Sequence, residues 1–376
     1  MADVQGIFNR IMNARKMKYD DIYKNSFKLI REKRTNEVNI FWNMMPIIRY
    51  LQREEVLNEV IAMTNKQKYA LAAEVLNWCA HYRNYFWTRH HVHTTFICYY
   101  SFTVPHMKQN LDPNYMLSYM DQFKFDHPVW GKLNQIFYEN MQLCEVISEY
   151  LPHIYIFNTH DCDTINLPYM FIPKFLETNK NASNIIYSPH EIDYQALKYP
   201  FTRTMIMRDK MLGRKEIMQY LVGKNKSTFT TNLSYMHLAL TLSCMGNPKI
   251  GLEPIKTKMG IVKAVKEIEQ CFQEGLIDDK EYSNIDNIAE MITDGNDEMT
   301  KRLINNFKLI SGNHAQTFLS RIANDKMKER FVDLEENESI MTLNQRYFQN
   351  NNIRLIELMQ GEYRILRSGK LQKLID

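Results

Sequence analysis

Long apolar runs, glycine and proline are all scarce in this chain. Its 376 residues include only 12 glycines and 11 prolines, whereas hydrophobic residues make up 45% and charged residues 24%. This composition excludes collagen-like, mucin-like and intrinsically disordered proteins, and it predicts a chain that buries a core. No run approaches the roughly 18 apolar residues of a membrane-spanning helix, and the first residues lack the apolar stretch of a signal peptide. We therefore expect no membrane association and a cytoplasmic location.

Paired cysteines and a strong excess of one charge are also missing. The cysteines lie far apart without any CxxC pair, so we expect reduced thiols at Cys79, Cys98, Cys144, Cys162, Cys244 and Cys271. The formal net charge is only +4. The overall charge therefore does not demand an anionic partner, and a nucleic-acid interface would have to come from local clusters.

Strand-like and helix-like segments alternate over the first half of the chain. Runs rich in β-branched and aromatic residues predict strands over 38–42, 94–100, 153–157 and 184–187. Between them, apolar residues recur at helical spacing, most clearly from Leu133 to Ile147, and Leu151-Pro152 ends that helix. Another helix is predicted to open at Asp161-Cys-Asp163, with its body from Ile165 to Leu176. The alternation predicts an α/β fold with a parallel sheet flanked by helices.

Beyond Leu221 the periodicity is helical throughout. Helices are predicted over 233–242, 260–272, 284–293, 299–310, 316–330 and 353–366. The expected buried stripe of the second of these helices consists of Ile261, Val265, Ile268 and Phe272. The chain is thus expected to comprise an N-terminal helical extension (1–36), an α/β core (37–220) and a helical C-terminal region (221–376).

Polar residues follow each predicted strand. They are Asn43, Ser101, Asp161 and Asp163, and then His190, Glu191 and Asp193. In an open parallel sheet the carboxyl ends of the strands form one edge, and ligands bind outside it. This edge is therefore where we expect the functional site.

In this order of elements the chain resembles the flap-endonuclease superfamily of 5′–3′ nucleases, which have a PIN-like core, and most closely their phage ribonuclease H branch. Glu149–Phe157 resembles the helix end and strand before the family's paired-acid motif, and Asp161-Cys-Asp163 occupies that motif's place. Asn184–Ser188 and Asp193–Pro200 are similar to the family's next acidic segment. Leu240–Lys258 falls where the family has a helix-three-turn-helix DNA clamp.

The resemblance extends from about Val38 to Ile310, and it implies a PIN-like fold followed by a degenerate helix-three-turn-helix. It also implies a site in which carboxylates hold divalent ions that activate water against a phosphodiester. The candidate metal ligands are Asp161, Asp163 and Asp193, which are carried over residue by residue, and Glu191, which does not align with a family position. The first three of these are also the candidate residual catalytic residues.

Several positions depart from the family's pattern. Residues without a carboxylate stand where the family has acids, at Asn43, Ser101, His190 and Asn247. The basic segment that grips the scissile phosphate is reduced, since residues 102–120 contain Lys108 as the one cation besides His106. The losses predict a degenerate site with at most one weakly bound Mg²⁺ and without a small-molecule cofactor.

The candidate acids also have a structural interpretation, as do the histidines. Asp161 and Asp163 would equally serve to cap a helix, and Asp193 would serve as a turn residue. A zinc site would need a fourth ligand beside His160, Cys162 and His190. Neighbouring residues of a strand point to opposite faces, which favours a surface or nucleic-acid contact over a metal site for His90, His91 and His93.

Lysines cluster around the helix that is predicted to start near Gly260. They are Lys224, Lys226, Lys249, Lys256, Lys258, Lys263 and Lys266. A helix N-terminus flanked by lysines suits a backbone phosphate, whereas a solvated helix face explains the same pattern without a ligand. The resemblance favours DNA, which would be bound with salt-sensitive affinity and without base specificity.

Three functional hypotheses follow. The favoured one is a phage-encoded nucleic-acid-binding protein derived from a flap nuclease, without efficient catalysis, that acts in viral DNA replication, transcription or packaging. The alternative is an active Mg²⁺-dependent 5′-flap or RNase H-type nuclease, and the third is a structural or protein-interaction subunit of a viral complex. The expected partners are branched or single-stranded DNA, or a viral protein complex.

Overall fold

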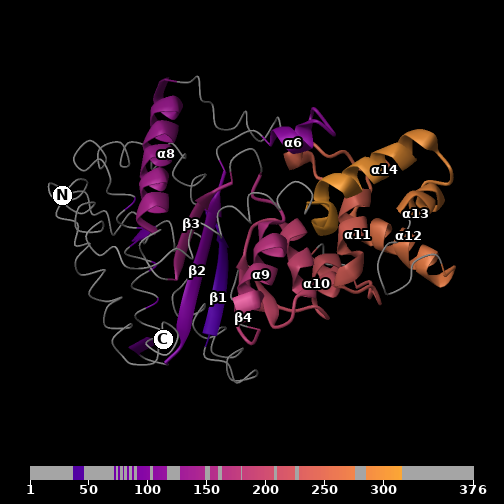
Figure 1. Ribbon diagram of the computed structural model, residues 1–376. Coiled ribbons are helices and arrows are strands. Elements are labelled where there is room, and N and C mark those ends of the chain that lie inside the picture. The colour runs from indigo at the N-terminus through magenta and orange to yellow at the C-terminus, as the bar shows by residue number, and fades with distance from the viewer. Residues whose placement is uncertain are drawn as a thin grey trace.

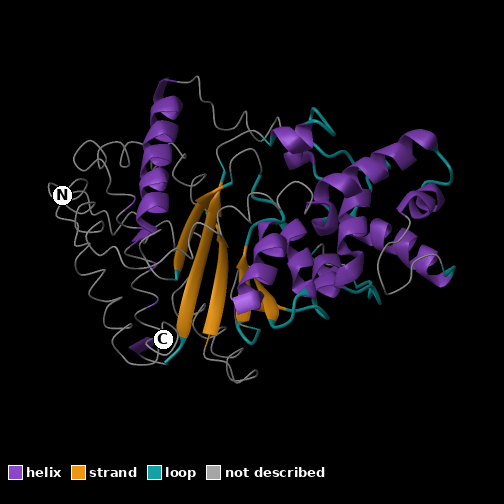
Figure 2. Ribbon diagram, in the orientation of Figure 1, coloured by secondary structure: helices purple, strands orange, loops and turns teal. Residues whose placement is uncertain are grey.

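The computed structural model is a mixed α/β fold with a six-stranded sheet at its centre (Figure 2). It describes residues 37–45, isolated positions between 72 and 88, and then 91–101, 105–116, 128–148, 153–159, 163–178, 180–206, 210–224, 228–275 and 285–315. The predicted extension 1–36 and the predicted helices 316–330 and 353–366 lie outside the described residues. So do His90, His160, Asp161, Cys162 and Lys226.

The sheet has the strand order β3-β2-β1-β4-β5-β6. Its strands are β1 (Glu37–Asn43), β2 (His93–Tyr100), β3 (Ile154–Asn158), β4 (Ser183–Tyr187), β5 (Thr202–Ile206) and β6 (Lys210–Leu212). Neighbouring strands are parallel from β3 to β5, and only β6 is antiparallel to its neighbour. The parallel sheet and its first four strands confirm the prediction, because each strand lies within one residue of its expected bounds.

Side chains of β1 alternate between two apolar layers. Ile40 and Trp42 belong to the larger buried cluster, which includes Phe137 and Met141 of helix α8 (Pro128–Ser148). Phe41 belongs to a second cluster that is built largely from helix α9 (Leu167–Thr178). Successive side chains of a strand face opposite sides of the sheet. Helices α8 and α9 therefore cover opposite faces, as Figure 1 shows.

Helices dominate the described residues after β6. They are α10 (Ile217–Gly223), α11 (Leu238–Met245), α12 (Ile261–Gln273), α13 (Ile285–Ile292) and α14 (Asp297–Ile310). Three 3₁₀ segments lie before and between them, η1 (Glu191–Lys198), η2 (Tyr235–His237) and η3 (Pro248–Ile250). The larger apolar cluster runs on from the sheet into these helices. Within the described part of the chain, no helix has the length and apolarity needed to cross a membrane.

Three local expectations were wrong. Strands β5 and β6 were not predicted, although they extend the sheet beyond β4. Helix α9 begins at Leu167, not at the aspartates before it, because Asn166 has a left-handed φ of 69° and the ring of Pro168 has no N–H to donate. Phe272 is not buried: it is 39% exposed and packs edge-on against His237 at a ring-centroid distance of 5.8 Å.

Candidate functional site

The five parallel strands β1 to β5 end at one edge of the sheet, and polar residues gather there. β1 lies in the middle of the sheet, with β2 on one side and β4 on the other. Strands β2 and β3 are thus added on one side of β1, and the later strands on its other side. Such a change of side opens a crevice at the carboxyl ends of the two diverging strands. We refer to this region, which comprises Asn43, Asn158, Asp163, Ser188 and Asp193, as the carboxyl edge.

Asp163 is the more heavily bonded of the two acids described at the carboxyl edge. Its side chain is 3% exposed. Oδ1 accepts a hydrogen bond from the backbone N–H of Ile165 at 2.7 Å, and Oδ2 accepts one from the Tyr115 hydroxyl at 2.8 Å. Asp163 therefore forms a turn ahead of α9. The sequence predicted that it would cap the helix, but the helix begins only at Leu167, after this turn.

A buried lysine completes the surroundings of Asp163. Lys108, in helix α6 (His106–Gln109), places its ammonium 3.0 Å from Oδ2 and 3.3 Å from Oδ1 of Asp163. The side chain of Lys108 is only 3% exposed, and its ammonium also donates to the Tyr115 hydroxyl at 3.3 Å. Sequence reasoning noted Lys108 only as an isolated cation and did not assign it to the site. Its isolation was the one available signal, because the helix HMKQ contains no acid with which it could pair locally.

Asp193 lies fully buried in η1 after β4. Oδ1 accepts the backbone N–H of Asn166 at 2.6 Å, and Oδ2 accepts the hydroxyl of Ser188. Burial raises the pKa of the Asp193 carboxyl to about 7, and the charge of Asp163 adds to the rise, while the two hydrogen bonds and the charge of Lys108 oppose it. The structure thus brings Asp163 and Asp193 to the same turn, where they accept the backbone N–H groups of the consecutive residues Ile165 and Asn166.

Glu191, the fourth candidate ligand, has a different partner. Its carboxylate forms an ion pair with Lys224, which also lies over the Tyr220 ring at 5.3 Å. About a third of the Glu191 side chain is exposed. Two of the predicted residues therefore bind each other at the surface. Asp161 lies outside the described residues, so its role as a ligand stays a prediction.

Neutral side chains hold the remaining positions of the carboxyl edge. Asn43 donates to the Thr164 hydroxyl at 3.1 Å and accepts the backbone N–H of Met45 at 3.0 Å. The Asn158 side chain is fully buried, and neither of its amide atoms has a hydrogen-bond partner among the described residues. Within the described ranges, no group of three or more histidine, cysteine, aspartate or glutamate residues is arranged to hold a metal ion.

His91 and His93, at the start of β2, lie at the opposite end of the sheet from the carboxyl edge. His93 stacks on Trp87 with a centroid distance of 4.2 Å, and His91 packs edge-on against the same ring at 5.8 Å. They stand at the amino end of β2, whereas the candidate acids follow the carboxyl ends of β3 and β4. These two histidines therefore belong to an aromatic cluster.

The predicted nucleic-acid-binding lysines divide into two groups. Lys224 is paired with Glu191, and Lys256 lies 3.6 Å from Glu267 and 4.0 Å from Asp294. The others are exposed and make no ion pair with a described residue: Lys249, Lys258, Lys263 and Lys266. Lys266 also lies over the ring of Phe229 at 5.3 Å. Three of these four, Lys258, Lys263 and Lys266, lie close in sequence to Gly260, the N-cap of α12.

The turn before α12, which consists of η3 and Gly251, packs against the 105–116 segment that carries Lys108. The backbone N–H of Met116 donates to the Ile250 carbonyl at 2.8 Å, and Gly251, at a φ of 80°, lies against the carbonyl of Asn114. Asn247 caps η3 by accepting the backbone N–H of Lys249 at 3.2 Å. Gly251 is therefore covered by the backbone of Asn114.

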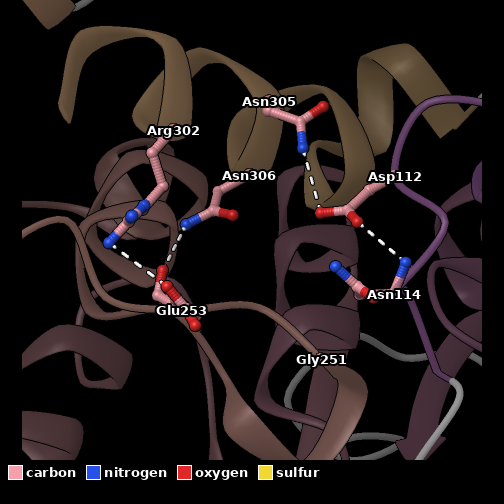
Figure 3. Close-up of a pocket in the computed structure, with 7 residues that line it drawn as sticks. All are labelled: Asp112, Asn114, Gly251, Glu253, Arg302, Asn305 and Asn306. Atoms are coloured by element: carbon pink, nitrogen blue, oxygen red, sulfur yellow. Dashed lines mark hydrogen bonds and ion pairs between the residues drawn. The ribbon is translucent and has the colours of Figure 1, made fainter. Parts of the chain in front are cut away.

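A polar cavity of about 270 Å³ lies between this turn, the 112–114 loop and α14 (Figure 3). Asp112 accepts a hydrogen bond from the Asn305 amide at 3.2 Å, and Arg302 lies 3.3 Å from Glu253. Asn306 donates to the backbone carbonyls of Ser243 and Glu253, both at 2.9 Å. Glu253 is thus paired with the charge of Arg302, whereas Asp112 is held by neutral donors, the Asn305 amide and the backbone N–H of Asn114.

Comparison with known proteins identifies the fold. No protein-family model matches the chain, and no curated protein sequence does either. Among solved structures, it is similar to the bacteriophage T5 flap endonuclease in a pseudo-enzyme–product complex with DNA and metal ions. The TM-score is 0.51 at 9% identity, over 78% of this chain and 99% of that one. The same phage protein co-crystallised with metal ions gives identical values. This likeness supports the PIN-like, flap-nuclease fold that the sequence resemblance implied.

Proposed function

We propose that this chain is a nucleic-acid-binding protein that uses a flap-nuclease fold to hold branched or single-stranded DNA without efficient cleavage. Action in viral DNA replication, transcription or packaging is part of the proposal. The observation that carries it is the group of exposed lysines without ion pairs around the start of α12. Their charges remain available to phosphates, because no described acid neutralises them.

The start of α12 supports phosphate binding in a second way. Gly260 precedes the helix in an extended conformation, is exposed and carries no side chain that would cap it. The first N–H groups of a helix and its dipole attract an anion, and flanking lysines strengthen that attraction. Lys258 and Lys263 lie on either side of Gly260 in sequence. Binding of this kind follows the backbone and carries no base specificity.

The carboxyl edge supports the absence of efficient cleavage. Two-metal phosphodiester hydrolysis needs carboxylates that hold both ions. Asn43, Ser101 and Asn158 contribute no charge at the ends of β1, β2 and β3. Asp163 forms an ion pair with Lys108, and Glu191 forms one with Lys224. These pairings leave few carboxylate oxygens for metal.

The decisive experiment measures binding and cleavage together on a labelled 5′-flap DNA, with Mg²⁺ or Mn²⁺, over a salt series. We expect a gel shift that weakens with salt and no cleavage. A plot of the logarithm of the DNA-binding constant against the logarithm of salt concentration should have a negative slope. In Lys263→Ala/Lys266→Ala its magnitude should decrease by about 0.7–0.9 for each phosphate that the variant no longer neutralises. Lys301→Ala/Lys308→Ala removes the same charge from exposed positions of α14 and should leave the slope unchanged.

The same experiment separates the other two hypotheses. The active nuclease is favoured by the proximity of Asp163 and Asp193, and it would appear as cleavage that Asp163→Asn abolishes. Absence of a shift on flap, single-stranded and duplex DNA at low salt would overturn the proposed function. That outcome would leave a structural or protein-interaction role as the remaining hypothesis.

A further inference from the structure

The Lys108–Asp163 pair lies where a flap-nuclease fold would use carboxylates to hold a divalent ion. We propose that the Lys108 ammonium is the resident cation of the carboxyl edge and that it excludes divalent metal from Asp163. The inference concerns the ion content of the site. It holds whether or not the chain binds DNA.

The contacts of Asp163 test whether a metal fits. A carboxylate offers about four lone-pair sites. In this chain they meet the backbone N–H of Ile165 at 2.7 Å, the Tyr115 hydroxyl at 2.8 Å and the Lys108 ammonium at 3.0 and 3.3 Å. Mg²⁺ requires oxygens at about 2.0–2.1 Å in near-octahedral geometry. An ammonium already in contact with both oxygens leaves no room for such an ion, and its charge repels one.

The burial of the pair supports the same conclusion. Both side chains are 3% exposed, so neither charge is screened by bulk water. A buried charge is strongly unfavourable unless a partner compensates it. The ammonium supplies the single positive charge that one carboxylate needs, and a divalent ion beside it would leave the pocket with excess positive charge. The amides of Asn43 and Asn158 carry no charge, and the Asp193 carboxyl, the other described acid of the carboxyl edge, is already bonded to Ser188 and to the backbone N–H of Asn166.

The backbone around Lys108 keeps the ammonium in place. Gln109 donates to the carbonyl of Tyr115 at 3.0 Å and closes the 105–116 segment on itself. Met116 is bonded to Ile250, and Asp112 to Asn305 of α14 at 3.2 Å. The segment is therefore held against both the turn before α12 and helix α14. Lys108 therefore extends to Asp163 from a segment whose backbone is held in place on both sides.

Manganese alone, as the probe, tests the proposal on the full chain. The free Mn²⁺ signal in electron paramagnetic resonance and the melting temperature are measured for the wild type, Lys108→Met, and Lys108→Met/Asp163→Asn. Lys301→Met, at an exposed position of α14, controls for the loss of one charge. We expect no saturable Mn²⁺ binding by the wild type or by Lys301→Met, at matched ionic strength.

Lys108→Met should melt at a lower temperature than the wild type, because it leaves the Asp163 carboxylate buried without a cation. It should also gain saturable Mn²⁺ binding, with a rise in melting temperature of about 2–4 °C near saturation. Lys108→Met/Asp163→Asn, which removes both charges, should recover most of the lost melting temperature and bind no Mn²⁺. Lys108→Gln keeps a neutral donor and replaces the methionine variant if that variant does not fold.

Two results would overturn the proposal. One is saturable Mn²⁺ binding by the wild type that disappears in Asp163→Asn. The other is a folded Lys108→Met or Lys108→Gln protein that still binds no Mn²⁺. None of these readouts uses nucleic acid, so a failure to bind DNA in the flap assay leaves this test unaffected.

Discussion

The carbonyl oxygen of Asn114 stands where a side chain at position 251 would begin: a Cβ built on Gly251 would lie 2.2 Å from it. The φ of Gly251 is 80°, which a residue with a side chain adopts only with strain. These two residues join the segment that carries Lys108 to the turn before α12. The contact therefore holds the segment that carries Lys108 against η3.

Gly251→Ala should lower the free energy of unfolding by about 1–3 kcal/mol, because it combines left-handed strain with a clash against backbone. Gly275→Ala is the matched control, since Gly275 has a φ of 75° but open space around its Cβ position. Only the strain of about 1 kcal/mol should remain there. Urea unfolding measures both, and equal losses would mean that the contact with Asn114 is not tight.

Asp193 should make stability depend on pH. The folded carboxyl keeps its proton up to about pH 7, whereas the unfolded one loses it near the ordinary value of 3.8. Between these values the folded state binds more protons, so this group's contribution to the free energy of unfolding falls as pH rises, by at most about 1.4 kcal/mol per pH unit. Asp193→Asn should remove that fall and gain stability relative to the wild type between pH 5 and 8.

Urea unfolding at several pH values checks this prediction. Asp286→Asn removes one carboxylate from an exposed position of α13, and its profile should run parallel to that of the wild type. If Asp193→Asn also runs parallel to the wild type, the buried carboxyl does not carry its proton into the neutral range.

Asn296 should stabilise α14 as its N-cap. Its side-chain oxygen accepts the backbone N–H of Met299 at 3.0 Å, and Asp297 and Glu298 follow in the first turn. Asn296→Ala should cost about 1 kcal/mol of unfolding free energy. Asn296→Asp keeps the acceptor and should remain close to the wild type. Similar losses in both variants would argue against the capping bond.

The buried thiols should resist labelling in the native state. Cys79, Cys98 and Cys144 are fully buried, and burial raises the pKa of the Cys79 and Cys144 thiols well above the ordinary value. Because the thiolate is the reactive form, maleimide should modify them only after unfolding. Mass spectrometry of labelled peptides from native and urea-treated protein reads each position separately. Native labelling of Cys79 would contradict its burial.

Local composition was sufficient to predict the centre of the sheet. The runs ending in Trp42 and Tyr100 are nearly continuous β-branched and aromatic segments, as strands buried on both faces should be. Strand β5 was missed because Arg203 interrupts a five-residue segment, leaving too little pattern to detect. The start of α9 depended on the backbone conformation of Asn166, which composition does not reveal.

The candidate site was predicted less completely, because its pairings are tertiary. Asp163 and Asp193 were found from their places after β3 and β4. Their partner Lys108 is 55 positions away from Asp163, and no local pattern links the two. The same holds for Glu191 and Lys224, which are 33 positions apart. Carboxylates in sequence motifs indicate where a site lies, whereas the cation that neutralises each one emerges only from the fold.

The central position of β1 has a consequence for how the chain is made. β1 needs β4 as a neighbour, and the buried Asn39 amide reaches its partner Asn184, 145 residues later, at 3.0 Å. At a synthesis rate of roughly 5–20 residues per second, that wait lasts about 7–30 s on the ribosome. During it, one edge of β1 offers unpaired backbone groups to any other extended segment. The yield of this protein should therefore depend on translation speed and chaperone supply.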